Sequence, residues 1–277
     1  MPGTLYVVGT PIGNLEDLSP RALRILREVQ LVAAEDTRTT RQLLEHFGVQ
    51  VPLLSCQDHN ETERAEQLIP RLLAGENIAL VSDAGMPGIS DPGFRLTREA
   101  QEAGVPVVGI PGPCAVVTAL SIAGLPTDRF LFLGFPPSKA GARRRWLEDV
   151  KHEPGTLALY ESPHRILETL QSIEEVLPGR QVALGRELTK RYEELLRGSP
   201  AEVRTQLEAH NEEKRRGEMT LLIEGARKGA KHVTPPPQLE AGAGIKALAG
   251  VVAQTLGVTK REAYQALLAL RGEATPE

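Results

Sequence analysis

The stretch IALVSDAGMPGISDPG, residues 78–93, joins a short apolar run to a loop of twelve residues with three glycines, two prolines and two aspartates. An apolar run of this length is typical of a buried strand, whereas the composition of the loop excludes both helix and strand. In α/β proteins, ligands bind at rigid loops that follow the carboxyl ends of strands. The stretch therefore predicts a strand of an α/β fold with a ligand site directly after it.

The two aspartates of this loop allow two interpretations. The carboxylate of Asp83 can accept hydrogen bonds from the ribose hydroxyls or from an amine of a ligand. Asp83 and Asp91 can instead cap tight turns, because aspartate side chains often bond to nearby backbone amides. The residues alone leave both interpretations open.

Apolar runs alternate with helical patterns before and after this loop. Ser19-Pro20 is a typical helix start, and Asn60 with Glu63 has the spacing of a capping-box variant. The predicted strands cover residues 5–8, 31–34, 53–55, 78–81 and 105–110, and the predicted helices cover 20–28, 39–47, 60–73 and 95–103. Strands separated by helices predict a parallel sheet with helices on its faces.

The pattern changes after residue 113, where a helix rich in small residues is expected over 115–123. Apolar runs follow at 130–135, 157–160, 182–184, 192–196 and 219–223, with helices expected near 142–150, 162–176 and 199–211. Ser162-Pro163 and Ser199-Pro200 are typical helix starts. The last three apolar runs are closely spaced, which predicts a second sheet that is partly antiparallel.

A third piece follows these two α/β domains. Residues 227–232 are basic, Pro235–Pro237 form a stiff spacer, and two helices are expected over 245–255 and 259–270. Thr259 and Glu262 have capping-box spacing, and two short helices around Gly257 resemble a helix-turn-helix. The alternative is a small helical appendage that packs on the body. We therefore expect a parallel-sheet domain over 1–114, a mixed-sheet domain over 115–230, and a linker with a helical extension over 231–277.

Composition limits the class of protein. The chain has 277 residues, of which 41% are hydrophobic and 4% aromatic, and its net charge is −4. Disordered, collagen-like and coiled-coil proteins are excluded, and any contact with nucleic acid must come from a local basic patch. Two cysteines, no signal peptide and no apolar stretch of membrane-spanning length predict a soluble cytosolic protein. The histidines and cysteines show no ligand spacing, so no metal site is expected.

Two more glycine-rich turns follow predicted strands. The turn GTPIGN, residues 9–14, follows the first strand and lacks the spacing of a dinucleotide fingerprint or a P-loop. The turn GIPGPCA, residues 109–115, ends in a helix start whose backbone amides suit a polar or anionic ligand. Cys114 is either a nucleophile activated by the helix dipole or a small residue that fits a tight turn beside a ligand.

Charged groups follow strands of the second domain as well. The segment ESPHR, residues 161–165, and the segment RELTK, residues 186–190, place ionisable side chains at strand ends. The most basic stretch of the chain runs from Lys139 to Lys151 and includes Arg143, Arg144 and Arg145. It is either a solvated helix face or a patch that contacts phosphate groups.

Taken together, these motifs resemble one family. The order GTPIGN, AEDTRTT, DHNE, VSDAGMPGISDPG, GIPGPCA, YESPHR, RELTK and GEMTLLIEG is similar to that of the 2′-O-methyltransferases I of the bacterial small ribosomal subunit, within the tetrapyrrole methylase superfamily. The resemblance covers about residues 3–225, and the tail also resembles the helical piece at the C-terminus of this family.

The resemblance implies a fold of two α/β domains, of the class III methyltransferase type, with the cofactor S-adenosylmethionine between them. It implies methylation of the ribose 2′-oxygen of a cytidine in the decoding region of 16S ribosomal RNA, usually by a homodimer. The residues that it places at the cofactor are Ile12, Asp83, Met86, Cys114, Ala115, Tyr160, Leu188 and Thr220.

A ribose hydroxyl is a weak nucleophile, so a base or a nearby cation should assist it. Glu187 is one candidate base, and Lys190 is another if burial lowers its pKa. The residues expected at the RNA are Arg38, Lys139, Arg143, Arg144, Arg145, Arg165 and Arg186.

Two alternatives share some of these features. A small-molecule methyltransferase that acts on a tetrapyrrole would have the same fold and cofactor, but would need neither the helical tail nor the basic stretch. A non-catalytic ribosome-binding module would keep the cofactor cleft only as a relic, and the complete set of loop motifs argues against it.

Overall fold

The structure is a computed structural model that describes residues 1–210, 217–226, 245–256 and 259–270. The chain divides into two compact units, Met1–Ala226 and Arg227–Glu277. The expected basic segment 227–232, the Pro235–Pro237 spacer and Gly257 lie outside the described residues. None of the helices in the described ranges is long and apolar enough to cross a membrane.

The first sheet is parallel and has the strand order β3-β2-β4-β1-β5, as the alternation of strands and helices predicted. Its strands are β1 (Leu5–Val8), β2 (Leu31–Ala34), β3 (Leu53–Ser55), β4 (Ile78–Val81) and β5 (Val107–Ile110). The connecting elements are a 3₁₀ turn at Leu15–Asp17, α1 (Pro20–Glu28), α2 (Thr37–His46), α3 (Glu61–Leu73) and α4 (Phe94–Glu102).

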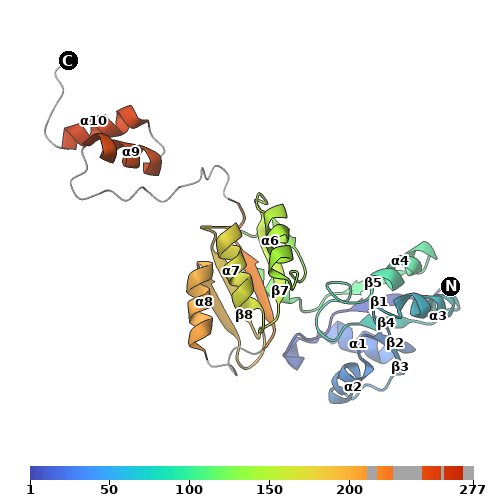
Figure 1. The fold of residues 1–277 in the computed structure, drawn as a ribbon. Coiled ribbons are helices and arrows are strands. Elements are labelled where there is room, and N and C mark those ends of the chain that lie inside the picture. Colours follow the sequence, from blue (N-terminus) through green and yellow to red (C-terminus); the bar gives the residue numbers. More distant parts are fainter. Residues whose placement is uncertain (211–216, 227–244, 257–258, 271–277) are drawn as a thin grey trace. The chain divides into compact units, whose positions relative to one another are not determined.

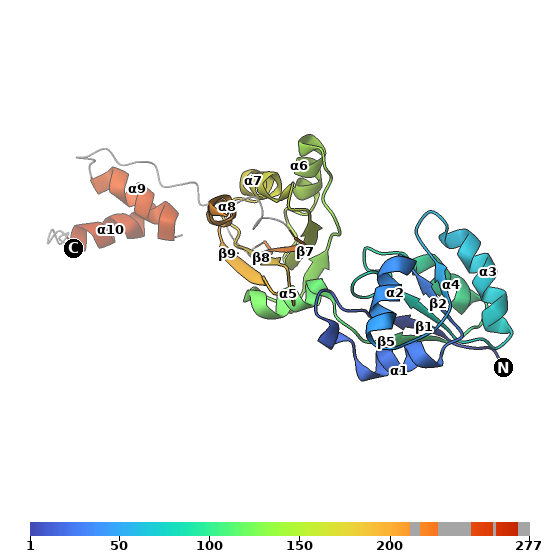
Figure 2. The same cartoon turned by 90° about the horizontal axis from the view of Figure 1, so that it is seen from below.

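Alternate residues of these strands enter two separate apolar layers. On one face, Val8 and Val32 pack with Ile25 of α1 and Leu44 of α2. On the other face, Leu5, Leu31 and Leu80 pack with helices α3 and α4. The period-two alternation of a strand that is covered on both faces explains why its sequence reads as a continuous apolar run. The layering can be followed in Figure 2.

The second sheet is mixed, with the order β6-β7-β10-β8-β9, in which β6 and β7 are parallel and the other pairs antiparallel. Its strands are β6 (Phe130–Phe132), β7 (Thr156–Glu161), β8 (Val182–Arg186), β9 (Glu194–Gly198) and β10 (Met219–Ile223). Helices α6 (Ala140–Asp149), α7 (Ile166–Val176) and α8 (Pro200–Ala209) cover one face, and α5 (Ala115–Ala123) covers the other (Figures 1 and 2).

One expected helix start and one expected capping box are wrong. Helix α7 begins at Ile166 and not at Ser162-Pro163, because the amide of Ser162 donates to the Glu161 carboxylate at 2.7 Å and holds this segment in a turn. Helix α3 lacks the expected capping box, since the Asn60 side chain accepts from the amide of Gln57 at 2.8 Å instead. The boxes at Ser199 and Thr259 are present, as predicted.

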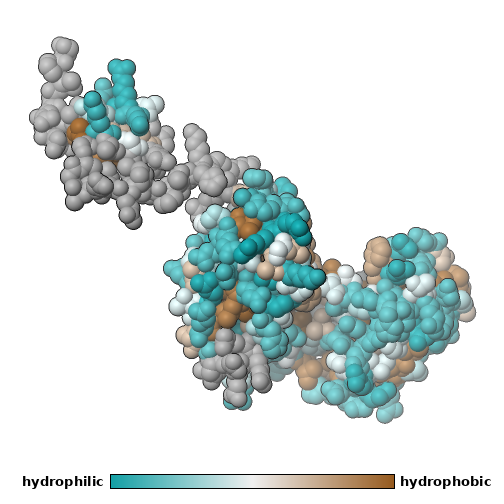
Figure 3. Space-filling view, in the orientation of Figure 1, coloured by the Kyte–Doolittle hydropathy of each residue, from teal (hydrophilic) through white to brown (hydrophobic). Residues whose placement is uncertain are grey.

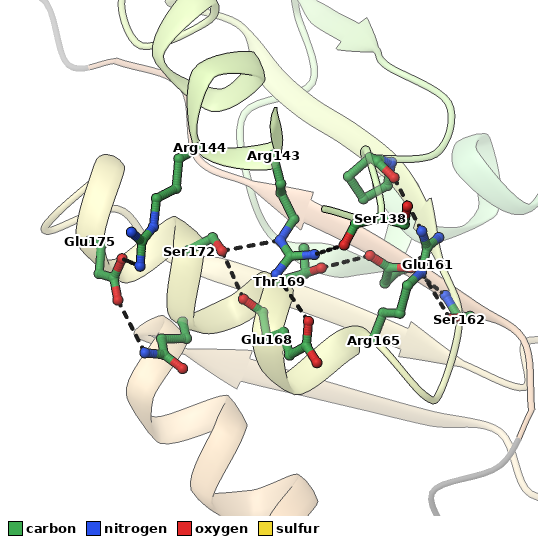
Figure 4. A network of polar contacts seen from close by, with 12 residues as sticks. Ser138, Arg143, Arg144, Glu161, Ser162, Arg165, Glu168, Thr169, Ser172 and Glu175 are labelled. Carbon is green, nitrogen blue, oxygen red and sulfur yellow. Dashed lines mark hydrogen bonds and ion pairs between the residues drawn. The ribbon is translucent and has the colours of Figure 1, made fainter. Parts of the chain in front are cut away.

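Arg143 is 1% exposed, so the expectation that it contacts RNA is wrong. Its guanidinium donates to the hydroxyl of Ser172 at 3.1 Å and pairs with Glu168 at 3.2 Å, which joins α6 to α7 (Figure 4). The bond from Arg143 to the carbonyl of Ser138 anchors the start of α6 as well. A buried guanidinium with this many partners is a structural group, because its burial needs such compensation.

The unit at the C-terminus contains α9 (Ile245–Leu256) and α10 (Lys260–Leu270). These helices pack through small side chains, with Ala249 and Ala253 of α9 against Ala263 of α10. The two predicted helices of the tail are therefore confirmed. Whether this unit contacts RNA stays a prediction.

The backbones of Gly9, after β1, and Gly112, after β5, lie in direct contact. A Cβ placed on Gly112 would lie 2.7 Å from the Cα of Gly9, which is closer than carbon atoms pack. We expect Gly112→Ala to lower the free energy of unfolding by about 1–3 kcal/mol, because backbone must shift to relieve the collision. Equilibrium denaturation in urea measures this change.

Gly109→Ala is the matched control for this variant, since a Cβ on Gly109 would meet no atom within 4 Å. It should be neutral or slightly stabilising, because alanine loses less backbone entropy on folding than glycine. Equal stability of the two variants would contradict the contact between Gly9 and Gly112.

Candidate active site

Two loops of the parallel sheet are joined by backbone hydrogen bonds. The amide of Thr10 donates to the carbonyl of Gly85 at 2.9 Å, and the amide of Gly85 donates to the carbonyl of Thr10 at 3.1 Å. The hydroxyl of Thr10 also donates to the carbonyl of Ser82 at 3.0 Å. The loop after β1 and the loop after β4 therefore form one continuous wall.

The third loop of this edge, between β5 and α5, reaches the second sheet. Cys114 is the N-cap residue of α5 in extended conformation, and its thiol makes no capping hydrogen bond. The amide of Val116 in the first turn of α5 bonds to the hydroxyl of Tyr160 on β7. Burial raises the pKa of Tyr160 above its ordinary value despite this bond, so its hydroxyl stays protonated at neutral pH.

A cavity of about 230 Å³ lies where these loops face the second sheet. Its walls come from the loops after β1, β4, β5 and β6, the end of β7 and the start of β10. The residues that line it are Ile12, Ala84, Gly85, Met86, Ile89, Ser90, Asp91, Cys114, Ala115, Phe135, Tyr160, Glu161, Glu218, Met219 and Thr220. The two α/β halves therefore build this site jointly.

One wall of the cavity is aromatic. The ring of Tyr160 packs edge-on against Phe132, with centroids 5.1 Å apart, and lies 5.5 Å from Phe135. On the other side, Ile12 and Met86 present apolar side chains. A largely apolar cavity with a few polar groups is typical of a small-molecule site.

The carboxylate of Glu161 at the end of β7 is fully occupied. Its Oε1 accepts from the amide of Ser162 at 2.7 Å and from Arg165 at 2.8 Å, and its Oε2 accepts from the Thr169 hydroxyl at 2.6 Å (Figure 4). The side chain of Glu161 is 0% exposed. Glu161 therefore fixes the turn before α7 and has little capacity left for a ligand.

Glu187 and Lys190, the candidate bases, form an ion pair at 2.9 Å in the turn after β8. Burial acts to raise the pKa of Glu187, but the bonds from Lys190 and from the amide of Glu218 lower it overall. Burial acts to lower the pKa of Lys190, but Glu187 and Glu218 raise it overall. The lowered pKa that Lys190 needs as a base is therefore absent, and neither residue lines the cavity.

This turn instead meets the loop after β1. A Cβ on Gly13 would lie 2.3 Å from Cγ of Lys190, so the lysine stem packs directly on the glycine. Thr189 and Glu187 both have positive φ angles, +66° and +51°, a strained conformation that persists where surrounding contacts impose it. We conclude that Glu187 and Lys190 position the loop that carries Ile12.

Six of the eight residues expected at the cofactor line the cavity, namely Ile12, Met86, Cys114, Ala115, Tyr160 and Thr220. Leu188 does not, because it is 6% exposed and packs with Ile12 in the apolar cluster behind the cavity wall. Asp83 lines a second cavity of about 340 Å³ on the other side of the same loops, together with Pro11, Gly13 and residues of α2.

Asp83 is held by backbone contacts with the loop after β2. Its Oδ1 accepts a hydrogen bond from the backbone amide of Asp36 at 3.1 Å. The backbone amide of Asp83 donates to the side-chain carboxylate of Glu35 at 3.1 Å. Burial raises the pKa of Asp83, although the bond from Asp36 opposes the shift. Within the described ranges, no group of three or more His, Cys, Asp or Glu side chains is arranged to hold a metal ion.

The arginines and lysine expected at the RNA differ in exposure. Arg38, whose side chain is 84% exposed, pairs with Asp36, and Arg144 pairs with Glu175 across α6 and α7. Lys139 and Arg145 are exposed. Arg165 is tied to Glu161, as described above.

Arg186 is 7% exposed and donates to Glu194 at 3.0 Å and to the carbonyl of Tyr192 at 3.3 Å. The expectation that Arg186 contacts RNA is therefore wrong, because its guanidinium is used inside the second sheet.

Sequence reasoning missed several residues of the cavity. Asp91 was interpreted only as a turn cap, although it lies in the same loop as Met86. Phe135 ends an apolar run, Glu218 precedes the last strand of the second sheet, and Met219 begins it. Strand β10 pairs with β7 in antiparallel register, and this pairing brings Thr220 opposite Tyr160. Strand order, which a single sequence does not reveal, was the missing information.

The sequence matches the family described as Tetrapyrrole (Corrin/Porphyrin) Methylases over residues 4–204. A protein of Pseudomonas aeruginosa named "Ribosomal RNA small subunit methyltransferase I" is 48% identical over 98% of this chain and 99% of its own length. Proteins of the same name from Escherichia coli O157:H7 and Xylella fastidiosa are 47% and 53% identical, over 98% and 81% of this chain and 96% and 82% of their own.

Solved structures show the same fold at lower identity. The methyltransferase CobJ is 18% identical, with a TM-score of 0.59 over 82% of this chain and 96% of its own. Uroporphyrin-III C-methyl transferase from Thermus thermophilus, solved in complex with S-adenyl homocysteine, is 19% identical, with a TM-score of 0.55 over 80% of this chain and 97% of its own. The sequence and the two-sheet architecture agree: this chain belongs to the tetrapyrrole methylase family and, within it, to the ribosomal RNA small subunit methyltransferase I proteins.

Proposed function

We propose that this chain transfers the methyl group of S-adenosylmethionine to the ribose 2′-oxygen of a cytidine in the decoding region of 16S ribosomal RNA, in the cytoplasm. The observation that carries the proposal is the cavity built jointly by the loops of both sheets, in a chain whose relatives are named as methyltransferases of small-subunit ribosomal RNA. The substrate is the small subunit or its RNA.

The residues of the cavity fit such a cofactor. Gly85 has a φ of +90°, and its backbone lines the cavity without a side chain. The apolar surfaces of Ile12, Met86 and Tyr160 suit a thioether and an aromatic base. Ala115, the first residue of α5, lines the cavity, and a helix N-terminus suits the polar end of the same molecule.

When bound, S-adenosylmethionine supplies a methyl group on a sulfonium, which is an electrophile that needs no metal. The chain then has to hold the 2′-hydroxyl about 3 Å from that methyl group and to accept its proton. The shared walls of the cavity provide rigid positioning, because the loops after β1 and β4 are bonded to each other. Positioning of this kind can lower the barrier by several kcal/mol.

RNA contact is assigned to the exposed basic residues that remain after the corrections above. Lys139, Arg144 and Arg145 belong to α6 or its N-cap and define what we call the α6 basic face. In the hydropathy view, hydrophilic residues surround smaller apolar patches over the second sheet and its helices (Figure 3). Arg38 is a separate exposed cation at the start of α2.

A direct test is incubation with radiolabelled S-adenosylmethionine and small ribosomal subunits from cells that lack the protein. We expect label in 16S RNA at one cytidine, whose 3′ linkage becomes resistant to alkaline cleavage because the 2′-oxygen is blocked. Deproteinised 16S RNA and a tetrapyrrole precursor serve as parallel substrates. Label in the tetrapyrrole alone would contradict the RNA assignment.

The α6 basic face yields a second prediction. Replacing Lys139, Arg144 and Arg145 with glutamine should weaken binding to small subunits and reduce the slope of log affinity against log salt by up to about 2–3, since each lost phosphate contact removes about 0.7–0.9. Arg21, Arg24 and Arg27 on α1, also exposed, give the matched control triple. Filter binding at several salt concentrations measures the affinity and the slope for both triple variants. Equal slopes for the two variants would refute the assignment of the α6 basic face to RNA binding.

We also propose that the protein is a homodimer. Large apolar side chains are exposed on α5, at Val117 and Ile122, and on the edge strand β6, at Phe130 and Leu131. Exposed apolar groups on an unpaired edge favour association. Sedimentation equilibrium should give twice the chain mass for the wild type and a lower mass for Phe130→Lys/Leu131→Lys. A wild-type monomer at micromolar concentration would disprove the dimer.

A further inference from the structure

The two helices of the C-terminal unit pack against each other and form a groove of about 390 Å³ (Figure 1). Helix α9 contributes Lys246 and Ala249 to the groove, and α10 contributes Lys260, Arg261 and Tyr264. Ala249 is 2% exposed and belongs to the apolar core of the unit. The groove therefore has a small apolar floor and a rim of three cations and one aromatic ring.

Charge is segregated within this unit. Lys246, Lys260 and Arg261 are all the lysines and arginines of residues 245–256 and 259–270, and each of them lines the groove. The one acidic residue of these ranges, Glu262, accepts from the amide of Thr259 at 2.8 Å and from its hydroxyl at 2.7 Å. None of the three cations pairs with a carboxylate of another described residue. The rim of the groove is therefore positively charged.

The aromatic ring of the groove is held beside these charges. Lys260 and Tyr264 are four residues apart on α10, and Arg261 and Tyr264 are three apart, so the three side chains share one side of the helix. Tyr264 is half-buried and packs against the alanine core between the helices. A Cβ on Gly250 would lie 3.3 Å from Cε of Lys260, so the stem of Lys260 lies across α9.

This combination suits a single-stranded nucleic acid. Cations spaced along a groove neutralise successive phosphates, and an aromatic ring beside them offers a face on which a base can stack. Lys260 and Arg261 lie in the first turn of α10, where positive charge opposes the helix dipole, so helix stability does not explain their position. A lipid surface is a poorer partner, because Val252 and Leu267 pack into the core of the unit.

Resting on the proposed function, we propose that this groove binds a single-stranded segment of the ribosomal RNA substrate. Its phosphates contact Lys246, Lys260 and Arg261, and one base stacks on the ring of Tyr264. Because this unit and the unit that holds the cavity belong to one chain, RNA bound by one is presented to the other at high effective concentration. The groove therefore raises the affinity for the substrate and takes no part in methyl transfer.

The first arm of the test is filter binding of the full chain to small ribosomal subunits over a range of salt concentrations. Lys246→Gln/Lys260→Gln/Arg261→Gln should bind at least about tenfold more weakly at low salt. Its slope of log affinity against log salt should fall by about 2–3, because three phosphate contacts are lost. The Arg21, Arg24 and Arg27 glutamine triple of α1 removes the same charge and should bind like wild type.

The second arm tests the ring. Tyr264→Phe should bind like wild type, since a phenyl ring stacks as well, whereas Tyr264→Leu should bind about 5- to 100-fold more weakly. Both replacements keep an apolar group against the alanine core. The glutamine triple changes only exposed side chains, so its result does not depend on how the unit packs after a change at Tyr264.

The third arm separates binding from chemistry. In the labelling assay, the glutamine triple should raise KM for small subunits by the factor that filter binding gives. Its kcat at saturating subunits and its affinity for S-adenosylmethionine in calorimetry should both stay within about twofold of wild type.

Wild-type affinity and an unchanged salt slope in the glutamine triple would overturn the proposal, as would a fall in kcat with unchanged affinity. If the triple kept its affinity for subunits and lost binding to phosphatidylglycerol vesicles, the groove would be a membrane site and the RNA assignment would fail. Absence of label in RNA with the wild type refutes the proposed function alone, because filter binding reads the contact between the groove and the subunit without methyl transfer.

Discussion

The backbone contact between Gly9 and Gly112, together with the paired bonds between Thr10 and Gly85, is the constraint on which the site depends. This constraint forces the loops after β1, β4 and β5 to meet at one edge of the parallel sheet. No side chain lies between the loop after β1 and the loop after β5 at the contact of Gly9 with Gly112. A Cβ at Gly9 would also lie 2.7 Å from the sulfur of Met86, so the same glycine sets the position of a cavity residue. The glycines of these turns are thus required by close approach rather than by flexibility.

From this edge the site extends into the second sheet through apolar packing. Ile12 of the first loop packs with Val116 and Leu120 of α5 and with Leu188, in the cluster that covers one face of the mixed sheet. Gly13 receives the stem of Lys190. Glu187 and Lys190, which the sequence suggested as catalytic bases, stabilise this arrangement of loops instead. Burial with partners makes a charge structural, as Arg143 and Arg186 show.

Most of the fold could be predicted from the sequence because strand and helix periods are local properties. Leu5–Val8, Leu31–Ala34 and Ile78–Val81 were predicted with the bounds that the structure has. The strand order and the start of α7 could not be predicted, because the first depends on long-range pairing and the second on a buried carboxylate that competes for the amide of Ser162. Arg143 and Arg186 show the same limit, since a basic residue does not reveal in the sequence whether acidic partners bury it.

The central claim is that loops of both halves close on one cofactor. Hydrogen exchange of the full chain with and without S-adenosylhomocysteine tests it directly, since backbone amides in contact with a bound ligand exchange more slowly. The account predicts that peptides covering residues 82–93, 112–118 and 217–223 gain protection together at the same ligand concentration. Protection of one half alone, or of the α2 residues beside Asp83 in place of these peptides, would contradict it.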